Sequence, residues 1–401
     1  MFKGSGRVRS GAILRRRGGG AYPWASDVAV LCGTLVVMTF LLLITGLGVA
    51  RAQVGATPPQ GGGDALATEL AQQADTLLSA GRYDQALKIL KQVIIFRPDD
   101  PAAQCRLALV YIKLERYEDA IKALRQAILF KANYIEAHNI LGSAYILLGR
   151  PEEALVALDQ AIRLQPDNAK AYVSMGAAHF LLNRYPEALA AYDRALMLEP
   201  DNALALLGRG EVYANLGRYD DAVSAIQESL RRNPQNAQAR LALAAVYGNL
   251  GRVDQASKVL QEAIHLRRDQ AEGYYGLGVM RFLRGDYREA AEAFKNALRL
   301  RPDYVQALTG LGEALGKLGQ SDQAEAALKQ AIRIKPDDAG AHFALGSAYA
   351  DYGNRGAALE EYERLKDLNP KMAQELFEVI LWSRGQVPRL SDLSLGRKVK
   401  K

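Results

Sequence analysis

The hydrophobic positions of residues 135–168 follow the spacing of two consecutive helices. Each half has one apolar cluster at helical spacing: Leu141, Gly142 and Tyr145 in the first, and Ala154, Leu158 and Ala161 in the second. Such clusters give each helix one apolar face. Gly149 separates the two runs, where a residue that tolerates φ > 0 ends the first helix, and Pro151 fits the first turn of the second. Pro166 then ends the second helix, so the pattern predicts a helical hairpin.

The same pattern returns with a fixed period along most of the chain. The proline position recurs as Pro98, Ala132, Pro166, Pro200, Pro234, Arg268, Pro302, Pro336 and Pro370. The turn between the two helices recurs as Gly81, Glu115, Gly149, Asn183, Gly217, Gly251, Gly285, Gly319 and Gly353. An alanine recurs without exception, as Ala86, Ala120, Ala154, Ala188, Ala222, Ala256, Ala290, Ala324 and Ala358. Two helices that cross closely need a small side chain at the contact, so the fixed alanine predicts a repeated, tightly crossed hairpin.

This phase-locked 34-residue period resembles the tetratricopeptide repeat (TPR) family. The resemblance covers nine units over residues 67–372, about three quarters of the chain. It implies an all-α fold, a right-handed superhelical solenoid of about nine helix-turn-helix repeats in which each unit buries its apolar face on its neighbours. Residues 373–383, with Leu376, Phe377 and Ile380 on one side, are predicted to form a helix that caps the last repeat.

The resemblance also implies a binding groove. In this family the first helices of the repeats line a concave surface, at positions that correspond here to Lys170, Val173, Ala177 and Phe180. Across units four to nine, the predicted groove consists of Val173, Phe180, Leu204, Leu207, Glu211, Leu241, Glu272, Tyr275, Val279, Phe282, Glu313 and Phe343. An exposed apolar stripe with an acidic border suits an extended or helical protein or peptide segment with apolar anchors. The alternative is that these side chains serve tighter packing between repeats.

The sequence before the repeats has three parts: residues 1–27 are basic, residues 28–50 are apolar, and residues 51–66 are rich in proline and glycine. Residues 28–50 carry no charge and are long enough for a transmembrane helix. Six bases precede this segment and only Arg51 follows closely, so the positive-inside rule places the N-terminus in the cytoplasm. Residues 51–66 are predicted to be a flexible tether. The repeats are therefore expected in the periplasm, on a protein that crosses the inner or cell membrane once.

A cleaved signal peptide is the alternative interpretation of residues 28–50. Ala50, Arg51 and Ala52 have the small-x-small form of a cleavage site, which would leave Gln53 as the first residue. The apolar run is, however, longer than the about 7–15 residues typical of a signal peptide. Both interpretations place the repeats outside the cytoplasm.

The net charge of +7 lies at the two ends of the chain. Residues 1–27 carry six bases and one acid, and residues 384–401, predicted to be a disordered basic tail, carry the same. Each end is therefore +5, which leaves −3 for the residues between them. A net negative repeat region offers no basic surface that could follow a phosphate backbone, so no nucleic-acid partner is expected.

The sequence contains no group of residues typical of catalysis. The four histidines fall in different units without metal-ligand spacing: His138, His179, His265 and His342. His138 and His342 share one repeat position, which indicates a structural slot near the helix contact. We therefore expect no catalytic, cofactor-binding or metal-binding residues, no cofactor and no enzymatic activity.

The leading hypothesis is a non-enzymatic, membrane-anchored scaffold whose exported repeats bind a protein or peptide in envelope assembly or secretion. One alternative is an accessory subunit that recruits substrate to a glycosyltransferase or a polysaccharide-synthesis complex. Another is an import receptor of a eukaryotic organelle, which has the same anchor but keeps the repeats in the cytosol.

Overall fold

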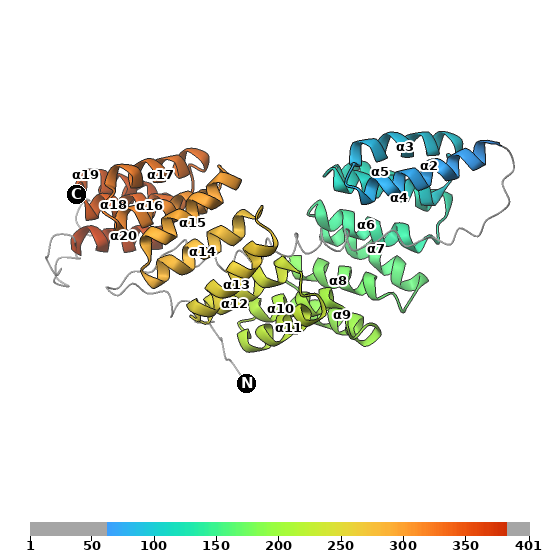
Figure 1. Cartoon of the computed structure of the whole chain (residues 1–401). Coiled ribbons are helices and arrows are strands. Elements are labelled where there is room, and N and C mark those ends of the chain that lie inside the picture. The colour runs from blue at the N-terminus through green and yellow to red at the C-terminus, as the bar shows by residue number, and fades with distance from the viewer. Residues whose placement is uncertain (1–61, 383–401) are drawn as a thin grey trace, which may run out of the picture. The chain divides into compact units, whose positions relative to one another are not determined.

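The structure is a computed structural model that describes residues 62–382 (Figure 1). The predicted basic segment 1–27, the predicted span 28–50, most of the predicted tether and the basic tail 384–401 lie outside the described residues. Between residues 62 and 382, no helix is both long enough and apolar enough to cross a membrane. Contacts divide the described residues into two compact units, 62–239 and 240–382.

The first unit consists of five consecutive helical hairpins. They are formed by α2 (Gly62–Ser79) with α3 (Tyr83–Phe96), α4 (Pro101–Lys113) with α5 (Tyr117–Phe130), α6 (Ile135–Leu147) with α7 (Pro151–Leu164), α8 (Ala169–Leu181) with α9 (Tyr185–Leu198), and α10 (Ala203–Asn215) with α11 (Tyr219–Arg232). The two helices of each hairpin pack against each other, and each second helix packs against the first helix of the next hairpin. Helix α12 (Ala237–Asn249) crosses the division between the two units.

The second unit continues the series with α13 to α20. Its helices are α13 (Val253–Leu266), α14 (Ala271–Arg284), α15 (Tyr287–Leu300), α16 (Val305–Lys317), α17 (Ser321–Ile334), α18 (Ala339–Asp351), α19 (Arg355–Leu368) and α20 (Pro370–Trp382). From α14 to α19 the pairing of hairpins is the same as in the first unit. The prediction of an all-α repeat fold is confirmed over the described part of the chain.

The turn inside each hairpin requires a left-handed backbone. Gly149 has φ 76°, and all nine recurring turn positions have positive φ. Two of them are not glycine: Asn183 has φ 55° and Glu115 has φ 57°. Asparagine enters this region more readily than most residues, whereas glutamate does so at a conformational cost. The geometry of the turn therefore comes from the repeat and overrides the preference of Glu115.

Small residues on the first helices make room for large ones on the second helices. Tyr192 on α9 illustrates this, because a β-carbon on Gly176 would lie 2.7 Å from its ring and one on Gly208 would lie 2.3 Å from it. Phe294 on α15 is enclosed in the same way by Gly278 and Gly310. The alanine that recurs in every unit is fully buried at all nine positions: Ala86, Ala120, Ala154, Ala188, Ala222, Ala256, Ala290, Ala324 and Ala358. The predicted close crossing of the two helices is thus present in both units.

The two ends of the described chain differ from the predicted boundaries by a few residues. The tether was predicted to extend to residue 66, but residues 62–66 already belong to α2. Arg97 explains this, since its guanidinium bonds to the Asp64 side chain at 3.0 Å and holds the first turn. The predicted capping helix begins at Pro370 rather than at residue 373, because the Asn369 side chain accepts a hydrogen bond from the Met372 amide. Helix α20 packs against α18 and α19, as a capping helix should.

Candidate partner-binding surface

The predicted groove residues of the first unit lie on two first helices, α8 and α10. Val173, Phe180 and Leu207 are buried, and Leu204 is half-buried. The Phe180 ring packs against Tyr185 of the following helix, with ring centroids 5.8 Å apart. Val173 and Phe180 belong to the hydrophobic core that joins neighbouring hairpins, and Leu204 packs against it.

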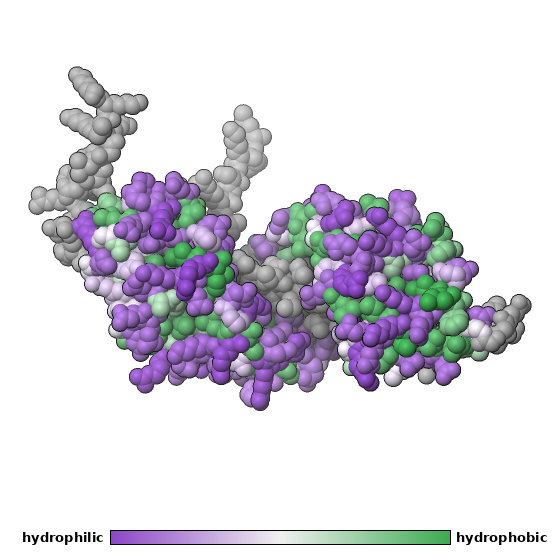
Figure 2. Space-filling view, turned by 90° about the horizontal axis from the view of Figure 1, so that it is seen from above, coloured by the Kyte–Doolittle hydropathy of each residue, from purple (hydrophilic) through white to green (hydrophobic). Residues whose placement is uncertain are grey.

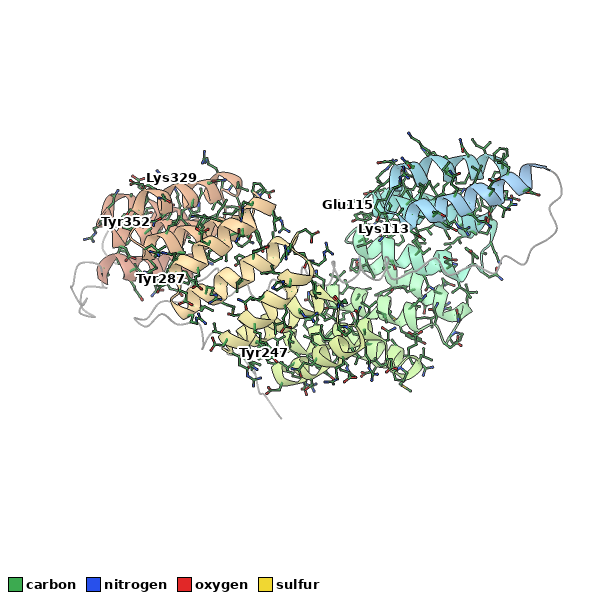
Figure 3. All side chains as sticks on the ribbon, viewed as in Figure 1. Lys113, Glu115, Tyr247, Tyr287, Lys329 and Tyr352 are labelled. Atoms are coloured by element: carbon green, nitrogen blue, oxygen red, sulfur yellow. The ribbon has the colours of Figure 1, made fainter. Side chains whose placement is uncertain are left out.

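The predicted groove residues of the second unit lie on α12, α14, α16 and α18. Leu241, Tyr275, Val279, Phe282 and Phe343 are all buried. The Tyr275 ring lies 5.1 Å from the ring of Tyr304 and 5.9 Å from that of Phe294, centroid to centroid. Phe282 meets Tyr287 edge to face at 5.2 Å, and Figure 3 labels Tyr287 at the start of α15. Tyr275 and Phe282 on α14 therefore both pack on the following helix α15.

The prediction of an exposed apolar stripe is wrong for most of these positions. The buried residues are Val173, Phe180, Leu207, Leu241, Tyr275, Val279, Phe282 and Phe343. The physical reason is that each first helix is packed both by its own second helix and by the neighbouring hairpins, so little apolar surface is left for a partner. This burial agrees with the alternative of tighter packing between repeats. Whether a partner binds near these positions is not decided by burial and stays a prediction.

The acidic border of the predicted groove is only partly open to solvent. Glu211 is buried, whereas Glu272 and Glu313 are half-buried. The Arg301 guanidinium donates a hydrogen bond to Glu272 and lies over the Tyr304 ring, 4.7 Å from its centroid. At least one border carboxylate is therefore held by a neighbouring cation.

Two histidines occupy the shared slot that the sequence predicts. His138 Nε2 lies 2.9 Å from the Ala132 carbonyl oxygen, and His342 Nε2 lies 2.9 Å from the Pro336 carbonyl oxygen. His342 Nδ1 also lies 2.5 Å from Glu361 Oε2 on α19, and both side chains are buried. The hydrogen bond to Glu361 raises the pKa of His342 more than burial lowers it. With acceptors at both ring nitrogens, the imidazolium form fits this site best.

Burial also shifts the pKa of several other titratable groups. Burial raises the pKa of the Cys105 thiol, and burial lowers the pKa of His179. Lys113, labelled in Figure 3 near Glu115, has its pKa lowered by burial. In the part of the chain that the structure describes, no three His, Cys, Asp or Glu side chains come together in a way that could hold a metal ion.

One surface feature was missed by the sequence reasoning. The outward sides of α3 and α5 expose apolar and basic side chains at equivalent positions, which we call the outer α3–α5 face: Lys91, Ile95, Phe96, Arg125, Leu129 and Phe130. Figure 2 shows hydrophobic and hydrophilic surface side by side on both units. The sequence does indicate that this position faces solvent, because the position of Ile95 and Leu129 holds arginine in four later repeats: Arg163, Arg231, Arg299 and Arg333.

Two family models match the chain. One, described as the Cilia and flagella-associated protein 70 C-terminal domain, matches residues 49–274. The other, described as the middle TPR-like domain of the same protein, matches residues 241–369. None of the curated proteins compared with the chain matches it.

Several solved structures are similar to the chain. The APC/C hetero-tetramer Cut9–Hcn1 has a TM-score of 0.56 and 17% identity, over 89% of this chain and 83% of that chain. TTC0263, a TPR protein of Thermus thermophilus, has a TM-score of 0.42 and 26% identity, over 45% of this chain and 98% of that chain. YrrB, described as a TPR protein with an unusual peptide-binding site, has a TM-score of 0.39 and 27% identity, over 46% and 95%. The likeness to Cut9–Hcn1 bears on the fold alone.

TPR proteins generally act as scaffolds for interactions between proteins. The first family model covers more than half of this chain. The two family matches and the helical hairpins agree on the same repeat. The chain therefore belongs to the family of the Cilia and flagella-associated protein 70 C-terminal domain, a TPR family.

Proposed function

We propose that the protein is a non-enzymatic scaffold, anchored in a membrane by residues 28–50, whose exported repeats bind a protein or peptide in envelope assembly or secretion. The observation that carries the proposal is the repeat architecture, in which successive first helices present equivalent side chains in rows. A row of this kind suits an extended segment of a partner, which meets the same position on one repeat after another. The uncharged run of residues 28–50 and the six bases before it support the anchor and its orientation.

The burial of the apolar stripe changes which side chains we expect to touch the partner. Glu136, Lys170 and Leu204 share one repeat position, the second residue of α6, α8 and α10. Lys170 is exposed, and the other two are half-buried. These residues are exposed enough to contact a partner, whereas Val173 and Phe180 are buried in the core.

Site-specific photo-crosslinking of the full-length protein in its own cells tests this proposal. A photoreactive amino acid is placed at Lys170 or Leu204, and a matched control carries it at Ala190, an exposed position on the second helix α9. We expect a discrete crosslinked protein from Lys170 and Leu204 that is absent from Ala190. The proposal fails if all three positions give the same products, or if none gives a product while the protein is folded and present in normal amounts.

A further inference from the structure

The most exposed large apolar side chains of the first two repeats lie in register. Ile95 on α3 is 76% exposed, and Leu129, at the same position one repeat later on α5, is 73% exposed. Phe96 and Phe130 follow them in the sequence and are also exposed. Helices α3 and α5 both pack against α4, so equivalent positions on them belong to neighbouring hairpins of one unit. Apolar surface that recurs on neighbouring hairpins is typical of a contact site.

Basic side chains accompany this apolar surface. Lys91 and Arg125 precede Ile95 and Leu129 by four residues, so they lie on the same side of their helices. Lys88 and Lys122 lie one further turn back and are exposed too. In repeats three and four, the position of Lys91 and Arg125 is acidic instead: Asp159 and Asp193. Later repeats hold lysine at this position again, Lys295 and Lys329, but the position of Ile95 is arginine there. The strongly exposed apolar pair of Ile95 and Leu129 together with these cations is therefore found only in the first two of the described repeats.

Lys91 on α3 lacks the intrahelical partner that its equivalent in a later repeat has. In the second unit, Lys329 occupies the position of Lys91 and lies 2.7 Å from Glu325, four residues before it (Figure 3). The residue four positions before Lys91 is Leu87. The first-turn acid of α3 is Asp84, which lies eleven residues before Ile95, or about 16 Å along the helix. The outward end of α3 is thus basic and apolar.

The outer α3–α5 face also lies close to the point where the chain enters the first repeat. The Arg97 guanidinium, just after Phe96, bonds to the Asp64 carboxylate at 3.0 Å, so the end of α3 lies against the start of α2. Residues 51–61 separate this point from the predicted span. Eleven residues reach at most about 40 Å when fully extended. A membrane anchored at residues 28–50 is therefore within reach of this face.

We propose that the outer α3–α5 face docks on the surface of a bilayer that contains anionic phospholipids, an inference that rests on the proposed membrane anchor. Exposed leucine, isoleucine and phenylalanine insert at the boundary between headgroups and acyl chains, while lysine and arginine attract anionic headgroups. The tether keeps the face at high local concentration beside the membrane, so that weak contacts suffice. A protein partner would explain the apolar residues, but charge complementarity and the short tether favour the lipid surface.

Full-length protein reconstituted into vesicles tests the proposal. In a Cys32→Ala background, Gln92→Cys on α3 carries an environment-sensitive fluorophore; Gln92 is exposed between Lys91 and the apolar pair. The native Cys105 is buried and poorly reactive. In vesicles of mixed phosphatidylcholine and phosphatidylglycerol we expect a blue-shifted emission that nitroxide-labelled lipids quench. Vesicles of phosphatidylcholine alone should lose most of the shift and quenching, and added salt should weaken both in the mixed vesicles.

Two variants identify the residues responsible. Ile95→Ser combined with Leu129→Ser should abolish most of the quenching without changing the thermal unfolding, since both side chains are largely exposed. Met197→Ser is the matched control, because Met197 occupies the same register on α9 and is 72% exposed. It should leave the signal unchanged.

The remaining outcomes overturn the proposal in different ways. Equal signals with and without phosphatidylglycerol would remove the role of anionic lipid, and a signal that rises with protein density would assign the face to a second copy. A fluorophore that stays in water, on protein that floats with vesicles after an alkaline wash, would overturn the docking and leave the anchor intact. Protein that does not float at all would overturn the proposed anchor, and the docking with it.

Discussion

The third repeat, in the first unit, and the ninth repeat, in the second unit, hold a histidine in the same position and use it differently. In both repeats the ring Nε2 lies 2.9 Å from the carbonyl oxygen six residues upstream. Only His342 has a second acceptor, Glu361 on α19, at 2.5 Å from Nδ1. The equivalent of Glu361 beside His138 is Ala157. The repeat register thus fixes where the ring lies, and one residue on the second helix decides whether the slot contains a buried ion pair.

The glycines of the same two repeats show a parallel difference. A β-carbon on Gly142 would lie 2.5 Å from Leu158 Cγ, a side chain of the same hairpin. A β-carbon on Gly346, at the equivalent position, would lie 2.5 Å from Leu376 Cδ2 on α20 and 3.2 Å from Glu361 Cβ. In the ninth repeat, the space beside Gly346 is therefore filled partly by the capping helix α20. The buried ion pair and the cap share one contact region.

The largest effect is expected when the carboxylate is removed from the ninth repeat. Glu361→Ala removes a hydrogen bond to a charged group, which contributes about 1.5–3 kcal/mol to stability. Hydrogen exchange of the amides in α18 and α19 should accelerate by the factor that corresponds to this loss of free energy. Exchange in α6 and α7 should stay unchanged. Glu360→Ala, at the exposed neighbouring residue, is the control. Equal effects of the two substitutions would show that the pair does not stabilise the fold.

The next effect concerns the glycines. Gly346→Ala should crowd Leu376 and Glu361 and cost about 1–3 kcal/mol, as overpacking of a core does. We expect faster exchange in α20 and α19, whereas Gly142→Ala should loosen α7 and leave α20 unaffected. Leu376→Ala added to Gly346→Ala should restore part of the loss. If Gly346→Ala leaves the exchange of α20 unchanged, the cap does not occupy this space.

The pH dependence of local stability should distinguish the site of His342 from that of His138. Because the folded state raises the pKa of His342, its imidazolium stabilises the ninth repeat fully below the unfolded pKa of about 6.5. This contribution is lost as the pH rises through the higher folded value. Exchange of α18 and α19, corrected for intrinsic rates, should therefore speed up between neutral and alkaline pH. The dependence should vanish in His342→Gln, and its persistence there would show that another titratable group causes it.

The smallest effect is expected in the third repeat. His138→Ala removes a single hydrogen bond to a backbone carbonyl, which contributes about 0.5–1.5 kcal/mol. The same substitution at His342 should cost more, because it leaves Glu361 buried without its cation. Urea unfolding followed by hydrogen exchange in α6 and α18 gives both values in one series. A larger loss from His138→Ala than from His342→Ala would contradict the distinction between the slots.

The sequence predicts the turn and the helix crossing of each hairpin well, because the same residue types recur at these positions in nine repeats. The turn at Gly149 and its equivalents has positive φ, as expected, even where Glu115 takes the position. The alanine at each helix crossing is fully buried. Both features depend only on contacts within one hairpin, and a fixed repeat period exposes such contacts directly.

The exposure of the first helices could not be predicted in the same way, because it depends on packing between hairpins. The Tyr275 ring packs on Phe294 of its own hairpin and also on Tyr304, which precedes the first helix of the next hairpin. The pairing of His342 with Glu361 was not predicted for a different reason: it lies within one hairpin, but the repeat does not restate it, since the equivalent of Glu361 beside His138 is Ala157. The outer α3–α5 face was not predicted, because the apolar character of Ile95 and Leu129 does not by itself show whether neighbouring hairpins cover them.

The central claim is that the chain is a scaffold held at a membrane with its repeats outside the cytoplasm. A recognition site for a specific protease, inserted after Gly61 in the full-length protein, tests it directly in vesicles prepared in both orientations from cells that make the protein. In right-side-out vesicles, added protease should cut the site and release the repeats into solution. In inside-out vesicles, the site should stay intact until detergent is added. Cleavage only in inside-out vesicles, or repeats found in the soluble fraction before any protease is added, would contradict the account.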